Sequence, residues 1–214
     1  MKTEELVDLL AGGGGAVEPV AATRRLAGAI SLGLVGATAL MMMFLGVRDD
    51  LAHGATGDAM FWVKVAFAAA GALVAVIAVS RLSRPGARLA SLPAVLAAPL
   101  VAVWVLAAFA LINATPGTRA ALVLGDSWLA CPVGITLLSA PLFVAVLWAM
   151  KGLAPTRLAL AGAAAGLVSG TLGALVYALH CPEDAAPFIG TWYVVGMMIP
   201  TGVGALIGPR ILRW

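Results

Sequence analysis

Six long apolar stretches dominate this chain and constrain its fold more than any other feature. A helix rises about 1.5 Å per residue, so about 20 apolar residues cross the hydrocarbon core of a bilayer. Each stretch is long enough to do so, and the sequence therefore predicts six transmembrane helices. The predicted spans are Leu26–Val47, Met60–Ser80, Leu92–Ile112, Leu129–Met150, Leu158–His180 and Phe188–Gly208.

The composition agrees with a lipid environment. Of 214 residues, 62% are hydrophobic and 11% are charged, whereas a soluble domain carries about 25% charged residues. This excludes an ordinary cytosolic enzyme, a nucleic-acid-binding domain and a disordered regulator. We expect an all-α, polytopic membrane protein that contacts the lipid bilayer and does not bind nucleic acid directly. It divides into an N-terminal tail, residues 1–25, and a six-helix transmembrane domain, residues 26–214.

The basic residues predict the orientation of the bundle. Ten of the 13 fall on one side of the predicted spans, and the positive-inside rule places that side in the cytoplasm. Both termini are then cytoplasmic. Most acidic residues lie on the other side. The ten basic residues are Lys2, Arg24, Arg25, Arg81, Arg84, Arg88, Lys151, Arg157, Arg210 and Arg213.

Lys64 is the one Asp, Glu, Lys or Arg residue inside a predicted span. An intramembrane charge often marks a functional site. Because Lys64 lies one turn from the end of its span, we expect it instead to extend to the headgroups. No acidic residue in the spans can pair with it, so the sequence offers no ion path, which argues against a pump or an ion-coupled transporter.

Two further patterns concern packing. Gly162, Gly166 and Gly170 recur every four residues along the fifth span, a spacing that lets two helix backbones approach closely in lipid. We expect them to form a seam within the molecule rather than a dimer interface. Trp62, Trp128, Trp192 and Tyr193 lie near the outer boundary and are predicted to form an aromatic belt.

The N-terminal tail predicts a short amphipathic helix that has Thr3 as its N-cap and ends at the glycine run. An isolated helix of this length is marginal in water, so either it folds in the groove of a partner or it is a frayed end without a role. Its candidate contacts are three leucines flanked by three acids, namely Glu4, Glu5, Leu6, Asp8, Leu9 and Leu10.

The two cysteines of the chain lie at matched positions. Cys131 opens the fourth span and Cys181 closes the fifth, so both thiols are expected at the outer surface, each followed by a proline. In an oxidising compartment they could form a disulfide. Pro132 suits the first helical position, which would place Cys131 at the N-cap, where the helix dipole favours a thiolate. We therefore predict that Cys131 attacks and Cys181 resolves; the alternative is two unrelated thiols.

A second interpretation of the same region is a metal site. His180, Glu183 and Asp184 flank Cys181, and thiol, imidazole and carboxylate groups together suit a soft or borderline metal ion. The sequence thus leaves open a disulfide and a transient heavy-metal ion on Cys131 and Cys181, and predicts no resident cofactor. Because it carries no catalytic motif, we do not expect an enzyme.

Several motifs together resemble those of the NrsF family, negative regulators of the extracytoplasmic-function (ECF) sigma factor called sigma F. The motifs are Cys131-Pro132, Ala154-Pro155-Thr156-Arg157, Tyr177-Ala178-Leu179-His180-Cys181-Pro182-Glu183-Asp184, Trp192-Tyr193 and the closing Gly208-Pro209-Arg210-x-Leu212-x-Trp214. The tail, which begins Met-Lys-Thr followed by acids and leucines, is also similar. The resemblance covers nearly the whole chain.

The resemblance implies a six-span anti-sigma factor of the bacterial inner membrane. Such a protein holds an ECF-type RNA polymerase sigma factor inactive and releases it under heavy-metal or oxidative stress. The two outer cysteines that this response requires would be Cys131 and Cys181. Two other classes of membrane protein account for these sequence features less well. A membrane thiol oxidoreductase normally needs a second redox pair, and a small-molecule transporter needs polar groups at mid-membrane. The regulated genes, the sensed agent and the oligomeric state stay open.

Overall fold

The computed structural model describes residues 2–13, 20–49, 58–84, 92–153 and 155–213. Its secondary structure in these ranges is helical, and six helices are long and apolar enough to cross a membrane. The six are α2 (Ala21–Phe44), α4 (Ala59–Leu82), α5 (Leu92–Asn113), α7 (Ala130–Lys151), α8 (Leu158–Tyr177) and the composite segment Ala186–Ile211. The predicted number of spans and the all-α class are confirmed.

Most helix boundaries differ from the prediction by a few residues, and three differences matter for the site and the packing. Helix α2 begins at Ala21, five residues before the predicted start, so that it carries two arginines in its first turns. Helix α8 ends at Tyr177, which leaves Cys181 outside the helix. The last span is not one regular helix. It consists of α9 (Ala186–Phe188), the π-helix η1 (Ile189–Tyr193) and α10 (Val194–Ile211).

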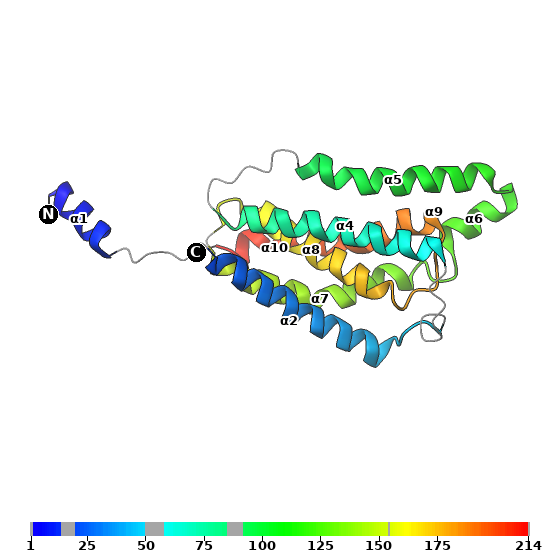
Figure 1. The fold of residues 1–214 in the computed structure, drawn as a ribbon, viewed down its shortest axis with the longest axis horizontal. Helices are drawn as coiled ribbons and strands as arrows, with labels where there is room; N and C mark the ends of the chain where they lie inside the picture. The colour runs from blue at the N-terminus through cyan, green and yellow to red at the C-terminus, as the bar shows by residue number, and fades with distance from the viewer. Residues whose placement is uncertain (1, 14–19, 50–57, 85–91, 154, 214) are drawn as a thin grey trace.

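Two shorter helices lie outside the bundle core. The predicted tail helix is present as α1 (Thr3–Gly13), and Figure 1 shows it apart from the bundle. Thr3 lies inside the helix, so the N-cap predicted at Thr3 is Lys2 instead. The carboxylate of Glu5 accepts a hydrogen bond from the backbone N–H of Lys2 at 3.0 Å, half of a capping box. Helix α6 (Pro116–Leu124), which the sequence pattern did not reveal, follows α5, with Pro116 in its first turn, where the missing N–H costs nothing.

Helix α8 is the central helix of the bundle, with α4, α7 and α10 packed around it, while α5 lies at the edge (Figure 1). The predicted glycine seam is confirmed as intramolecular. A Cβ atom on Gly162 would collide with the carbonyl oxygen of Gly204, and one on Gly166 would collide with that of Pro200. Only glycine permits α8 and α10 to touch at backbone level along this line.

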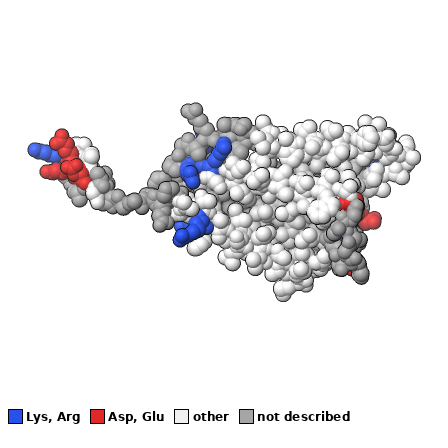
Figure 2. Space-filling model, viewed as in Figure 1, with Lys and Arg blue, Asp and Glu red and all other residues white. Residues whose placement is uncertain are grey.

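The charged side chains gather at opposite ends of the bundle (Figure 2). The starts of α2 and α8 and the ends of α4, α7 and α10 carry most of the described Lys and Arg residues, and we call this the basic end. The acidic end holds the start of α7, the turn after α8 and the start of α4, with both cysteines. This polarity is the pattern from which the orientation was predicted.

Of the residues predicted to form an aromatic belt, Tyr193 does not lie at the surface. Trp128 and Trp192 pack together at the acidic end with ring centroids 5.3 Å apart, and the Trp192 indole donates to the carbonyl of Val123 at 2.8 Å. Tyr193 is fully buried instead. It lies in the π-helix, whose wider turn changes the direction in which side chains point, and a sequence read at α-helical period does not anticipate this.

Candidate functional site

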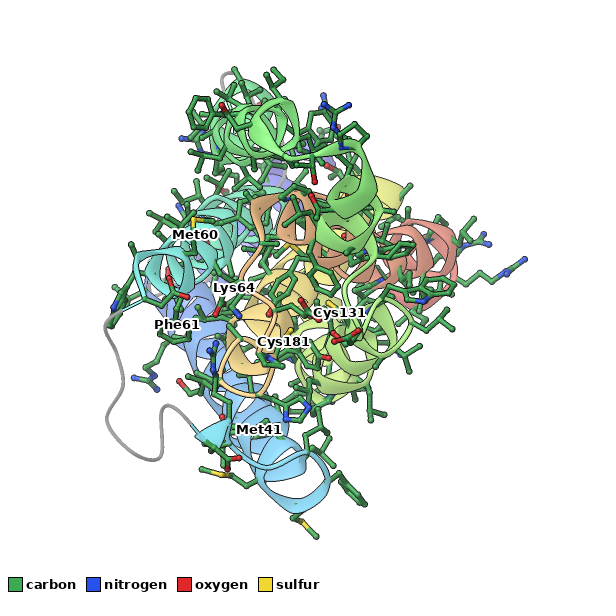
Figure 3. All side chains as sticks on the ribbon, turned by 90° about the vertical axis from the view of Figure 1, so that its right-hand side faces the viewer. Met41, Met60, Phe61, Lys64, Cys131 and Cys181 are labelled. Atoms are coloured by element: carbon green, nitrogen blue, oxygen red, sulfur yellow. The ribbon has the colours of Figure 1, made fainter. Side chains whose placement is uncertain are left out.

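The two cysteines lie together at the acidic end of the bundle, as predicted (Figure 3). Cys131 is in the first turn of α7, one residue inside the helix rather than at its N-cap, which is Leu129. Cys181 is in the turn after α8. The two thiols are free and hydrogen-bond to each other, and neither side chain has any exposed surface. The two thiols, 50 residues apart in the sequence, are thus in direct contact.

The turn that carries Cys181 is held by backbone hydrogen bonds on both sides. Its N–H donates to the carbonyl of Tyr177 at 3.0 Å, and Pro182, which has no N–H, then ends the helical path. The segment after α2 closes over the turn: the Arg48 N–H donates to the Leu179 carbonyl at 3.1 Å, and a His180 ring nitrogen lies 3.1 Å from the Gly46 carbonyl. Cys181 is therefore held in place by a segment more than 130 residues earlier.

Lys64 on α4 reaches the same turn. Its side chain is fully buried, and its ammonium donates to the carbonyls of Cys181 at 2.9 Å and Glu183 at 3.0 Å. It also forms an ion pair with Asp184 at 2.5 Å between Nζ and Oδ1. The expectation that Lys64 extends to the headgroups is wrong. Its partner comes from outside the spans, and burying an ammonium requires such partners.

Arg48 and Asp184 extend this polar cluster. Arg48 lies 3.0 Å from Oδ2 of Asp184 and 3.3 Å from the carbonyl of Cys181. The Asp184 carboxylate thus lies between two cations, one from α4 and one from the segment after α2. The rings of Phe61 and Tyr193 complete the surroundings of Lys64, with centroids 5.7 Å and 5.9 Å from Nζ.

Glu183 ties the Cys181 turn to the helix that carries the other thiol. Its carboxylate accepts a hydrogen bond from the backbone N–H of Asp126 at 2.8 Å. The neighbouring Gly125 has a φ of +55°, which favours glycine, and a Cβ there would lie 2.8 Å from the same carboxylate. Since α7 begins a few residues later, this contact sets the start of α7 against the Cys181 turn.

The surroundings favour a thiolate at Cys181. The pKa of Cys181 is lowered from 9.0 to about 6, first because the Cys131 thiol donates a hydrogen bond to it and then because Lys64 is positively charged, while burial acts in the opposite direction. Both effects oppose the prediction that Cys131 attacks. The helix dipole alone supported that choice, whereas the hydrogen bond and the charge of Lys64 both favour Cys181 as the thiolate.

The five predicted metal ligands do not form one site. Cys131 and Cys181 are together, but the side chains of His180, Glu183 and Asp184 are engaged with Gly46, Asp126 and Lys64 respectively. In the described ranges no group of three His, Cys, Asp or Glu side chains could hold a metal ion. What remains is a pair of soft sulfur ligands, with the hydroxyl of Tyr193 close to Cys181 and without a regular hydrogen-bond partner.

The candidate tail contacts lie on α1. Glu4, Glu5 and Asp8 are exposed, and Leu6 is 41% exposed. The side chains of Leu9 and Leu10 lie outside the described residues. An exposed leucine beside acidic groups is consistent with the predicted amphipathic stripe, but the structure does not bring α1 to the thiol pair.

The chain matches known proteins along its whole length. Residues 10–214 match the model of a family described as NrsF, negative regulator of sigma F. The "Probable anti-sigma-F factor NrsF" of Azospira oryzae is 53% identical over 214 residues, with all of both chains covered. The "Anti-sigma-F factor NrsF" of Caulobacter vibrioides is 38% identical over 216 residues, again with both chains fully covered. No solved structure matches.

Proposed function

The chain belongs to the NrsF family of negative regulators of sigma F, and from that premise we propose that it is a membrane-embedded anti-sigma factor whose thiol pair controls release of the sigma factor. The observation that carries the proposal is the contact between Cys131 in α7 and Cys181 in the turn after α8, two buried thiols that hydrogen-bond at one end of the bundle. The partner is an ECF-type sigma factor, and the membrane is the bacterial inner membrane, with both termini in the cytoplasm.

The chemistry of the pair suits two signals. With a peroxide, the Cys181 thiolate attacks one oxygen and becomes a sulfenic acid, while the hydroxide that leaves takes up the proton lost by the thiol and becomes water. The Cys131 thiol then attacks that sulfur, and a second water leaves as the disulfide forms. The peroxide gains the two electrons that the thiols lose. A soft divalent metal ion would instead displace both thiol protons and bind the two sulfurs. Either product joins the start of α7 to the turn after α8.

The sigma factor is held by the tail in this proposal. A sigma factor presents basic surface to DNA, and the acidic, leucine-bearing helix α1 is complementary to such a surface. The family model begins at residue 10 and so leaves most of α1 outside its match, although the two relatives align with the whole chain. We expect the tail contacts to be Glu4, Glu5, Leu6, Asp8, Leu9 and Leu10.

Release can be measured on the full-length chain in membranes with its sigma factor bound. Hydrogen peroxide or cadmium ion is added, and the sigma factor remaining in the membrane fraction is quantified. We expect release from the unaltered chain and retention by both Cys131→Ser and Cys181→Ser, because neither variant can join the two helix ends. The double variant should behave like either single one.

If both single variants release the sigma factor as the unaltered chain does, the thiol pair is not the sensor. Ser139→Ala is a suitable control, because Ser139 is a buried residue of α7 whose hydroxyl bonds only within its own helix, to the carbonyl of Thr136. It should respond like the unaltered chain. A general loss of response caused by any small change in α7 would appear in this control as well.

A further inference from the structure

Lys64 makes three contacts with one short segment of the chain. An ammonium has three N–H donors, and Lys64 uses its Nζ on the carbonyl of Cys181, the carbonyl of Glu183 and the carboxylate of Asp184. All three acceptors belong to residues 181–184. We propose that Lys64 is the positioning residue of the thiol pair, holding this segment so that the Cys181 sulfur faces Cys131 and stays reactive. The inference deepens the proposed function and rests on it for its biological meaning.

The burial of Lys64 supports a dedicated role. The side chain has no exposed surface although its helix position would let it reach the headgroups. Burying an ammonium is costly unless hydrogen bonds and an opposite charge compensate. Here the compensation comes from the Asp184 carboxylate and from two backbone carbonyls in the turn after α8, which lies outside any helix. The arrangement therefore couples the charge of α4 to the conformation of the Cys181 turn (Figure 3).

A simpler role would be to neutralise Asp184. The geometry argues against it, because Arg48 already contacts the other oxygen of that carboxylate at 3.0 Å. Moreover, two of the three Lys64 contacts go to carbonyls and not to the acid. A lysine needed only as a counter-ion for Asp184 would not need to hold the backbone on both sides of Pro182.

The charged and titratable groups around Cys181 come from six parts of the fold. Cys131 faces it from α7, Lys64 from α4, Tyr177 from α8 and Tyr193 from η1, and Glu183 belongs to its own turn. His180 and Asp184 flank it in the same turn, and Arg48 contacts its carbonyl. Among these groups Lys64 is the cation that lowers the pKa of Cys181, so removing it should be visible in the pH dependence of this thiol.

The test measures the alkylation of Cys181 in a chain where it is the sole thiol. In the Cys131→Ser background the serine hydroxyl can still donate a hydrogen bond, and Cys181 is the one remaining cysteine. The full-length protein in detergent is treated with iodoacetamide from pH 5 to 9, and the midpoint of the rate against pH is recorded. Three variants are compared in this background: Lys64→Met, Lys64→Met with Asp184→Asn, and Lys151→Met.

We expect the midpoint to rise by about one pH unit or more with Lys64→Met, because the thiolate loses the positive charge that stabilises it. The double variant should show the same rise and should fold better, since it leaves no buried carboxylate without its lysine. Lys151→Met is the matched control, an exposed lysine in the last turn of α7 at the basic end, and its midpoint should not move. Tryptophan fluorescence melting of the same samples identifies an unfolded chain.

Two results would overturn the inference. If Lys64→Met leaves the midpoint unchanged, Lys64 does not act on Cys181. If the double variant returns to the midpoint of the background chain, Lys64 serves only Asp184. The alkylation measurement needs no sigma factor, so it is independent of the proposed function. A shifted midpoint in a protein whose cysteine variants still release the sigma factor would refute the sensor role and leave the positioning role of Lys64 intact.

Discussion

At the scale of single residues, the main result is a buried thiol that favours its charged form. Burial normally disfavours a thiolate, and Cys181 has no exposed surface. The hydrogen bond from Cys131 and the charge of Lys64 outweigh that effect. Because the sulfur is reactive but enclosed, we expect small agents such as peroxide or a metal ion to reach it more readily than bulky ones.

The lowered pKa of Cys181 also predicts how stability depends on pH. A group whose pKa falls from 9.0 to about 6 on folding contributes stability that is complete above pH 9 and is lost as the pH falls to about 6. The melting temperature of the reduced protein in detergent should therefore decrease between pH 9 and pH 6. Below pH 6 this contribution is gone.

Cys181→Ser provides the comparison for this experiment. Serine does not ionise in this range, so the variant should show a weaker decrease in melting temperature from pH 9 to pH 6 than the unaltered chain. Equal slopes in the two proteins would mean that the Cys181 thiol keeps its ordinary pKa in the folded state.

Some of these contacts between residues could be predicted from the sequence, and others could not. The cysteines could be paired from sequence because helix polarity places residue 131 and residue 181 at the same end. The partner of Lys64 could not be found by searching the spans for acids, because Asp184 lies in a connection 120 residues away. Lys64 lies one turn inside its span, so a search for acidic residues just outside the ends of the other spans would have identified Asp184 as a partner.

At the scale of elements, α1 carries the prediction about the partner. Leu6→Ala with Leu9→Ala should weaken binding of the sigma factor about tenfold or more, because each change removes apolar area that a complex would bury. Binding is measured by titrating the purified sigma factor onto the full-length protein in nanodiscs. Val7→Ala, on the same helix but off the predicted stripe, is the control and should bind normally.

An unchanged affinity in the leucine double variant would place the sigma contact elsewhere on the chain. The sequence predicts the remaining elements with unequal success. Long apolar segments identify a span whatever its neighbours, so six were found. The π-helix at Ile189–Tyr193 and the short α6 depend on tertiary contacts, such as the Trp104 indole that donates to the Gly190 carbonyl at 3.0 Å, and local sequence does not encode these.

At the scale of the whole molecule, the separation of charge predicts the orientation in the membrane. A reporter active only in the cytoplasm should work when fused after Trp214 or inserted at Arg84. A reporter active only outside should work at Thr118, on α6 at the acidic end. These outcomes follow because the basic end is expected to stay on the cytoplasmic side. Cytoplasmic activity at Thr118 would refute the orientation and with it the external position of the thiol pair.

The glycine contact between α8 and α10 has a mechanical consequence. Two helices that touch backbone to backbone at Gly162 and Gly166 have no side chains between them to yield, so the pair should behave as a stiff beam about 30 Å long. Cys181 follows one end of that beam, and Leu158 and Gly208 meet at the other. If a disulfide or a metal ion moved one end of this pair, α8 and α10 would move together as one rigid unit. The displacement would then reach the opposite face of the bilayer without being absorbed in between.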